Sequence, residues 1–141
     1  MMRRRLAPRG FTLVELMIVV TVIAILASTA YASYMDALRK GWRAEARAAL
    51  MQEMQQQERF YTQRATYRGT VFNSGSDATA GGGKYTLAVG PCDGQAGTRH
   101  CIRLTATLKS QFVDPLAWAF WLDSRGERGC TGTASPSGCW P

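Results

Sequence analysis

Residues 9–16 are Arg9-Gly10-Phe11-Thr12-Leu13-Val14-Glu15-Leu16, and this stretch decides the fold of the chain. Four arginines precede its phenylalanine, three of them in the run at residues 3–5. Residues 16–35 then contain no charged side chain, which is long enough for an α-helix to cross about 30 Å of hydrocarbon. The sequence therefore predicts a membrane-spanning helix, with the arginines holding its amino terminus on the cytoplasmic side.

Glu15 places an acid at the start of this apolar segment. A carboxylate inside a membrane costs about 2.5 to 3.5 kcal/mol on insertion scales, so it is expected to have a partner. The chain offers no cation at that depth, but a cut between Gly10 and Phe11 would create an α-amino group four residues away. That amine could neutralise Glu15 in its own helix, or the Glu15 of a second, staggered copy. The second arrangement would assemble a polymer.

Residues 9–20, RGFTLVELMIVV, resemble the processing site of type IV prepilins, the precursors of pilus subunits and of type II secretion pseudopilins. The resemblance implies that a membrane prepilin peptidase cuts after Gly10 and methylates the new amino terminus of Phe11. It also implies that Glu15 is the acid that these proteins use in the registration of subunits during assembly. Ala24 and Ala32 stand where relatives often carry glycine and proline, which argues against melting of the intervening helix in the filament.

Two other interpretations of the amino terminus are a secretory signal and a plain single-span anchor. A small-residue cleavage site could lie at Ala27-Ser28-Thr29-Ala30. Both alternatives leave Glu15 without a role, so the prepilin interpretation is preferred.

The resemblance divides the chain into three parts: a cleaved leader at residues 1–10, a transmembrane and filament-core helix half at 11–36, and a globular head at 37–141. The formal net charge is +7, but four of the seventeen basic residues lie in the leader. After cleavage the protein would be only mildly basic. With the head outside the cytoplasm, its four cysteines are expected to form disulfides.

The helix is expected to continue from about Phe11 to Tyr61, because residues 36–62 lack proline and are rich in helix formers. Its second half carries an apolar stripe at three- and four-residue steps. The stripe consists of Leu38, Trp42, Ala46, Ala49, Leu50, Met54, Gln57 and Tyr61. Residues 55–62 and 65–67 are also similar to the helix exit of PilE-like minor pilins, although an aromatic anchor at a helix end has the same pattern.

The segment Thr70–Gly83 has no periodicity and is expected to be a loop. Its glycines, Gly81 to Gly83, lack the strand, helix and lysine-serine pair of a phosphate-binding loop. Apolar patterning then predicts strands at Lys84–Val89, Ile102–Leu108, Trp118–Leu122 and Glu127–Thr131, the third covered on both faces. The expected fold class is α+β, a type IV pilin roll with a long amino-terminal helix packed on an antiparallel sheet of about four strands.

Four cysteines allow three pairings. Pairing within short loops, Cys92 with Cys101 and Cys130 with Cys139, is favoured over the other two. A zinc site is the competing interpretation, but there is no Cys-x-x-Cys and His100 is the only histidine. Neither a metal nor a cofactor is therefore expected.

The carboxyl-terminal segment Thr131–Gly138 is expected to be an exposed, uncharged loop, which in pilins varies between relatives and contacts neighbours or ligands. Trp140 is expected to pack on the sheet or the disulfide, with a ligand role as the alternative.

The sequence does not predict an enzyme, because no nucleophile has a plausible histidine partner. The resemblance implies a structural subunit of a type IV pilus, most like a PilE-like minor pilin, serving adhesion, twitching motility or DNA uptake. Its partners would be the prepilin peptidase, other pilin subunits and the inner-membrane assembly machinery. It would lie in the inner membrane as a single-pass protein with a cytoplasmic amino terminus and periplasmic head, and then in the extracellular pilus.

Two rival functions remain. The nearest is a pseudopilin of type II secretion, although major pseudopilins generally lack this disulfide pattern. The less favoured one is a DNA-binding tip pilin, whose basic residues would align on neighbouring strands and contact phosphates. The candidates are Arg99, Arg103, Lys109, Arg125 and Arg128.

Overall fold

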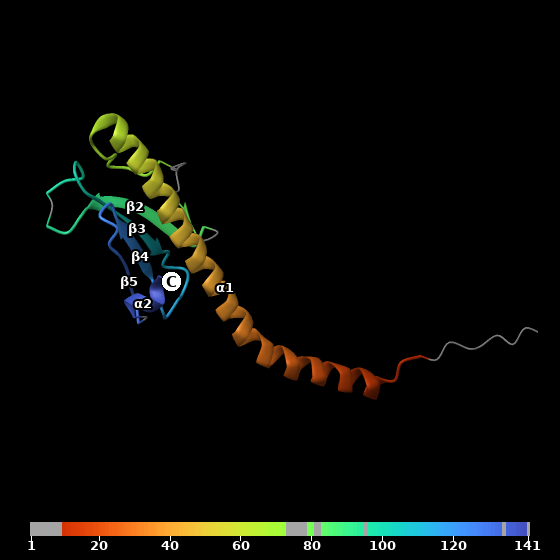
Figure 1. Cartoon of the computed structure of the whole chain (residues 1–141). Coiled ribbons are helices and arrows are strands. Elements are labelled where there is room, and N and C mark those ends of the chain that lie inside the picture. Colours follow the sequence, from red (N-terminus) through yellow and green to blue (C-terminus); the bar gives the residue numbers. More distant parts are fainter. Residues whose placement is uncertain (1–9, 73–78, 81–82, 95, 134, 141) are drawn as a thin grey trace, which may run out of the picture. The chain divides into compact units, whose positions relative to one another are not determined.

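The computed structural model describes residues 10–72, 79–80, 83–94, 96–133 and 135–140, and it contains two compact units, Met1–Ala37 and Leu38–Pro141. Its elements are two helices and five strands (Figure 1). They are α1 (Leu13–Arg64), β1 (Thr79–Ala80), β2 (Tyr85–Pro91), β3 (Ile102–Leu108), β4 (Ala119–Asp123), β5 (Arg128–Thr131) and α2 (Pro136–Cys139). The sequence predicted α1 at residues 11–61, so both of its ends lie within three residues of the prediction.

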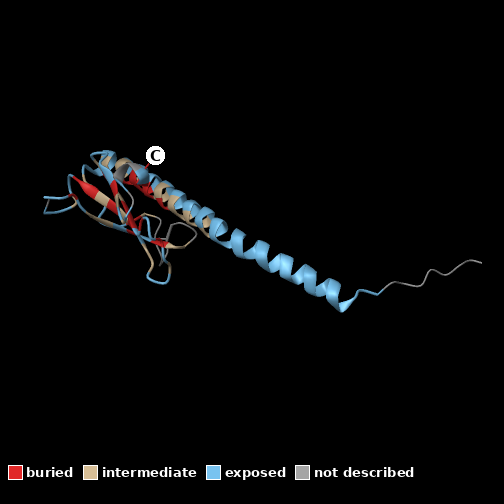
Figure 2. Ribbon diagram, turned by 90° about the horizontal axis from the view of Figure 1, so that it is seen from below, coloured by how far each residue is buried: buried red, intermediate tan, exposed pale blue. Residues whose placement is uncertain are grey.

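The first unit holds the apolar part of α1. The hydroxyl oxygen of Thr12 accepts a hydrogen bond from the Glu15 backbone N–H at 3.3 Å, which caps the amino terminus of the helix. The acidic side chain of Glu15 then lies in the first turn, where the helix dipole favours negative charge. Side chains of this part are exposed on all sides (Figure 2).

In the second unit α1 buries one stripe of side chains against the sheet (Figure 2). Ala46, Leu50, Met54 and Gln57 are buried, as the spacing predicted, and Trp42, Ala49 and Tyr61 pack beside them half-buried. The stripe also contains Glu53, which is 1% exposed and which apolar patterning did not reveal. The amphipathic second half of the helix is therefore confirmed.

The sheet is an antiparallel meander in the order β1-β2-β3-β4-β5. Strands β2 to β5 match the four predicted runs to within a few residues. The expectation of a loop from Thr70 to Gly83 was wrong at Thr79–Ala80, which pairs with β2. Two residues are too few to show an alternating pattern, so the sequence carried no signal for β1. The rest of this glycine-rich segment lies largely outside the described residues.

Alternate side chains of the strands form the core with the α1 stripe. On this inner face, Tyr85, Ile102, Leu104, Ala106 and Phe120 are at most 1% exposed. They form one hydrophobic cluster with Leu50 and Met54 of α1. This cluster holds α1 against the sheet and thereby positions the other residues of the head.

Strand β4 was expected to be covered on both faces, and its outer face carries two buried residues, Ala119 and Asp123, on either side of the half-buried Trp121. Trp121 on that face is half-buried, and the Arg103 guanidinium lies over its ring, 4.2 Å from the centroid. The indole lies directly over β5, where a Cβ on Gly129 would stand 2.6 Å from Trp121 Cζ2. A cation and a glycine therefore provide part of the cover of the indole on this face.

An ion pair joins α1 to the connection between β3 and β4. The Arg43 guanidinium donates two hydrogen bonds to the carboxylate of Asp114, from Nε to Oδ2 at 2.6 Å and from Nη2 to Oδ1 at 2.7 Å. Asp114 is buried and also accepts the Leu116 N–H at 3.0 Å. Such a bidentate pair fixes the orientation of both groups.

The carboxyl-terminal segment is exposed at Thr131, Thr133, Ser135 and Gly138, as expected, but it is not a plain loop. It contains a single helical turn, α2, whose Ser135 hydroxyl accepts the Gly138 N–H at 3.3 Å. Trp140 is buried, as expected: its indole N–H donates to the Gly129 carbonyl at 2.9 Å and its ring meets Phe120 edge-on. The turn was not predicted because a four-residue helix shows no hydrophobic period.

Candidate functional site

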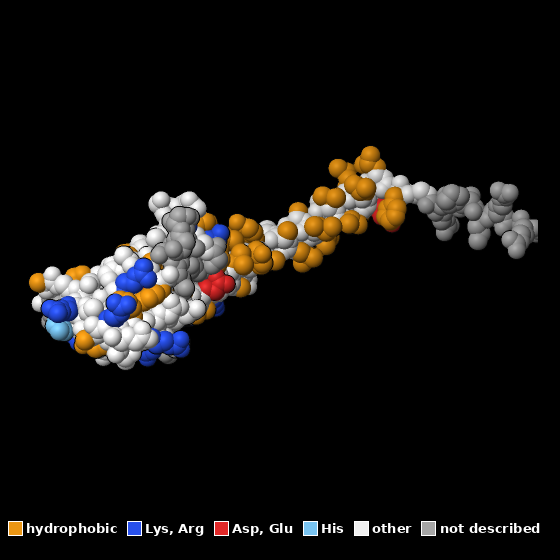
Figure 3. Space-filling model, turned by 90° about the horizontal axis from the view of Figure 1, so that it is seen from above, with side chains coloured by type: hydrophobic (Ala, Val, Ile, Leu, Met, Phe, Trp, Pro, Cys, Tyr) orange, Lys and Arg blue, Asp and Glu red, His pale blue; other side chains and the backbone are white. Residues whose placement is uncertain are grey.

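The apolar part of α1 has no partner within the chain. The helix contains a window with a mean hydropathy of 2.4, none of which is buried, and it is long and apolar enough to cross a membrane. Hydrophobic side chains occupy the visible faces of this segment, whereas basic ones gather on the head (Figure 3). Phe11, Leu13 and Ile25 are 80%, 74% and 66% exposed. A surface of this kind needs lipid or another subunit to cover it.

Three hydroxyl groups in this segment donate to its own backbone. Thr21 donates to the Ile18 carbonyl at 2.8 Å, and Ser28 donates to the Ile25 carbonyl at 2.8 Å. Thr29 does the same to Leu26 at 3.0 Å. These three side chains therefore need no hydrogen-bond partner outside the helix, as an apolar environment requires.

The residues of the expected processing site lie at the start of this segment. Gly10 and Phe11 precede α1 and both are exposed. Glu15 is also exposed, and it forms no ion pair within the described part of the chain. The structure thus brings Phe11 and Glu15 to the same end of the helix.

The head contains two disulfides, between Cys92 and Cys101 and between Cys130 and Cys139, the pairs favoured from the sequence. Their Cα atoms are 5.6 Å and 6.0 Å apart. Asp123 lies within 4.8 Å of the first pair of sulfurs, but these sulfurs are bonded to each other and cannot serve as thiolate ligands. The cysteines therefore act as structural links.

The five basic residues that were expected to align as a strip on neighbouring strands do not lie together in the structure. Arg103 forms an ion pair with Asp93 at 2.7 Å and lies 4.0 Å from Asp123. Arg125 pairs with Asp123 at 3.1 Å and with Glu127 at 3.3 Å, which raises its pKa. These two guanidinium groups are held by acids of the β4–β5 turn and of the loop after β2.

The other three members of the strip lie apart from these two. Lys109 follows the far end of β3, where its backbone N–H donates to the Lys84 carbonyl. Arg128 stands opposite Leu122 in the β4–β5 register, with its guanidinium 5.6 Å from the Trp140 ring. Arg99 is exposed in the β2–β3 connection. No continuous basic strip is therefore formed along the outer face of the strands.

A different basic and aromatic cluster lies at the carboxyl end of α1. Phe60 and Phe72 meet edge to face with ring centroids 5.7 Å apart. The Arg64 guanidinium lies 5.9 Å from the Phe60 centroid, and that of Arg68 lies 4.8 Å from the Phe72 centroid. Sequence reasoning missed this cluster, although arginines at 59, 64 and 68 alternate with aromatic residues from 60 to 72.

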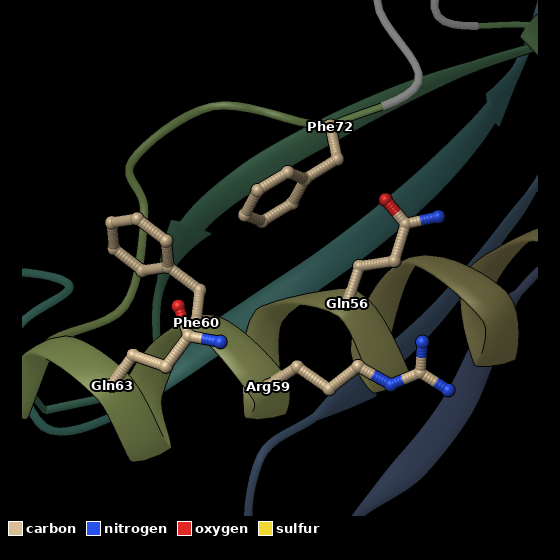
Figure 4. A pocket seen from close by; sticks show the side chains of 5 residues that line it. All are labelled: Gln56, Arg59, Phe60, Gln63 and Phe72. Carbon is tan, nitrogen blue, oxygen red and sulfur yellow. The ribbon is translucent and has the colours of Figure 1, made fainter.

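This cluster borders a shallow cavity of about 340 Å³ that is widely open to solvent (Figure 4). Its lining is mixed, with aromatic, amide and guanidinium groups. The residues are Gln56, Arg59, Phe60, Gln63 and Phe72. Cavities of this size and composition accept small organic groups or parts of larger ligands.

Two ionisable groups, Tyr85 of β2 and Arg47 of α1, lie where α1 packs on the rest of the head. Burial raises the pKa of Tyr85 to about 12, and the nearby Asp114 carboxylate acts in the same direction. Burial together with the neighbouring Arg43 lowers the pKa of Arg47, whose guanidinium donates to the Cys139 carbonyl at 2.6 Å. Both side chains join α1 to the rest of the head, and neither lines the cavity at the end of α1.

Comparison with known proteins gives the family. Residues 32–115 match the family model described as type IV minor pilin ComP, DNA uptake sequence receptor, and residues 5–31 match the prokaryotic N-terminal methylation motif. A solved type IV pilin from Shewanella oneidensis is similar at 21% identity and a TM-score of 0.48, over 68% of this chain and 90% of that chain. No curated protein matches. Because the first model covers more than half of the chain, this protein belongs to the ComP family of type IV minor pilins.

Proposed function

We propose that the head of this minor pilin binds DNA during DNA uptake. The observation that carries the proposal is the match of residues 32–115 to a family described as a DNA uptake sequence receptor. The charge of the head supports it, since residues 38–141 contain thirteen Lys and Arg against eight Asp and Glu. DNA uptake is thus preferred to the adhesion, motility and secretion roles that the sequence alone left open.

The amino-terminal segment has a separate role in assembly. The family implies processing by a prepilin peptidase, anchoring in a membrane and assembly with other pilins. We place the cut after Gly10, the methyl group on the Phe11 amine, and the partner of that amine on Glu15 of a neighbouring subunit. The exposed positions of all three residues support this assignment.

Binding of DNA is tested with the full-length mature protein in detergent micelles. We expect a labelled duplex to bind with an affinity that falls as salt is raised, because each lysine or arginine on a phosphate releases a counterion. Fluorescence anisotropy over a salt series measures the slope. Failure of the protein to bind any DNA at low salt would refute the proposal.

Processing is tested by the intact mass of protein extracted from membranes. The expected chain starts at Phe11, carries one added methyl group and lacks four cysteine hydrogens. A chain that begins at its initiator methionine, or that starts beyond Ala30, would contradict the assignment of the cleavage site.

A further inference from the structure

The cavity at the end of α1 is built by two segments that meet there. Gln56, Phe60 and Gln63 lie four and three residues apart, so they share one face of the helix (Figure 4). Phe72 comes from the chain that follows the helix and stands opposite Phe60. Both rings are half-buried, and a guanidinium lies over each, that of Arg64 over Phe60 and that of Arg68 over Phe72, so only part of each ring is accessible.

Buried hydrogen bonds hold the second segment in place. The Glu53 carboxylate accepts the Phe72 N–H at 2.7 Å, and the Gln57 side chain accepts the Arg68 N–H at 2.9 Å. Gln57 also donates to the Thr70 carbonyl at 3.0 Å. Both Glu53 and Gln57 are at most 1% exposed. Phe72 is therefore positioned before any ligand arrives, which lowers the entropy cost of binding.

The charge around the cavity is positive. Arg59, Arg64 and Arg68 are exposed, and the described residues include no ion-pair partner for any of them. The nearest acid in sequence, Glu58, accepts the Tyr67 hydroxyl at 2.8 Å. These arginines thus differ from Arg103 and Arg125, which are held by acids.

We propose that this cavity receives an unpaired base of a DNA strand whose phosphates contact Arg59, Arg64 and Arg68, an inference that rests on the proposed function. The accessible parts of aromatic rings stack on bases, and guanidinium groups pair with phosphate oxygens. The amides of Gln56 and Gln63 can form hydrogen bonds with a base edge. Bases inside a duplex are stacked on each other, so the site selects single-stranded DNA or an unpaired nucleotide.

The test compares a short oligothymidylate with a hairpin duplex of equal phosphate number, using full-length mature protein in micelles and fluorescence anisotropy. We expect the single strand to bind more tightly than the duplex. Phe60→Leu and Phe72→Leu keep apolar bulk but remove the ring, and each should weaken single-strand binding about tenfold while changing duplex binding less. Phe60→Tyr keeps the ring and should retain the wild-type affinity.

The arginines are tested by salt dependence. The double variant Arg64→Gln/Arg68→Gln should bind the single strand more weakly and with a salt slope smaller by about 0.7 for each lost phosphate contact. Matched controls are Arg99→Gln, an exposed arginine on the β2–β3 connection, and Trp118→Leu, a half-exposed aromatic residue after β3. Neither control should change binding.

The outcomes separate this inference from the proposed function. If the wild type binds duplex and the Phe60, Phe72 and arginine variants bind both DNA forms as it does, the cavity is not the site but DNA binding stands. Equal losses in the Arg99 or Trp118 controls would also overturn the inference. Loss of affinity in Phe60→Tyr as large as in Phe60→Leu would refute stacking. If the wild type binds neither form, the proposed function itself fails.

Discussion

The two parts of α1 differ in what covers their apolar side chains. From Leu13 to Ala37 the helix buries no apolar side chain within the chain. From Leu38 to Arg64 it buries a stripe of side chains against the sheet of the head. The acids show the same contrast: Glu15 is exposed, and Glu53 is buried and bonded to the Phe72 N–H. The first part of the helix therefore has an apolar surface that needs lipid or another subunit to cover it, whereas the apolar surface of the second part is covered by the sheet.

The largest expected effect comes from removing the acid of the first part. Glu15→Val should still be cleaved and stay in the membrane, but its incorporation into sheared pili should fall by about tenfold or more, because the amine of a neighbouring Phe11 loses its partner. Quantitative immunoblotting of shed pili and membranes measures this, with Met17→Leu as the control. Incorporation of Glu15→Val at the wild-type level would contradict the proposed pairing of Glu15 with the amine of Phe11.

Truncation of one leucine in each part of α1 tests the contrast directly. Leu50→Ala should destabilise the head by about 2 to 5 kcal/mol, because a fully buried side chain leaves a cavity. Leu16→Ala, at a side chain that is 58% exposed, should leave head stability unchanged. Denaturant unfolding of the mature protein in micelles, followed by tryptophan fluorescence, gives both values. Equal losses would mean that the two parts are not independent.

Alkaline pH should destabilise the second part through Tyr85. Its pKa is raised to about 12 in the folded protein, above about 10 in an unfolded chain, so the folded state keeps the proton longer. This contribution is complete below pH 10 and should decline by about 1.4 kcal/mol per pH unit as pH rises from about 10 to 12. Unfolding free energies of wild type and Tyr85→Phe measure the difference.

The Tyr85→Phe variant should lose this part of the pH dependence, whereas Tyr34→Phe, an exposed position on the first part of α1, should keep it. Identical slopes in wild type and Tyr85→Phe would show that another group controls alkaline unfolding.

The smallest expected effect concerns the buried acid. Glu53→Ala leaves the Phe72 N–H without its acceptor and should cost about 1 to 3 kcal/mol of head stability. Glu45→Ala, at an exposed position of the same helix, is the matched control and should change stability by less than about 0.5 kcal/mol. A neutral Glu53→Ala would indicate that the segment after α1 is held by its other contacts.

Much of the fold could be predicted because it depends on periodic patterns. The three- and four-residue steps from Trp42 to Tyr61 gave the buried stripe of α1, and the alternation in Ile102–Leu108 gave β3. The elements that were missed, β1 and α2, are too short to repeat any pattern. Glu53 was missed for another reason: its burial depends on backbone N–H groups that only the folded chain supplies.

The candidate DNA site could not be predicted from the sequence. Arg103 and Arg125 were expected to be available for DNA, but Asp93 and Asp123 hold them in ion pairs, and side-chain pairing of this kind is not visible in a sequence pattern. The Phe60–Phe72 cavity could not be predicted either, because the two rings are brought together by the hydrogen bonds of Glu53 and Gln57 across a twelve-residue separation.

The inward-turned hydroxyls of Thr21, Ser28 and Thr29 have a consequence for the movement of a subunit. Each already donates to a carbonyl of the preceding turn, so none of the three hydroxyls needs a new hydrogen-bond partner when lipid around the helix is exchanged for other apolar helices.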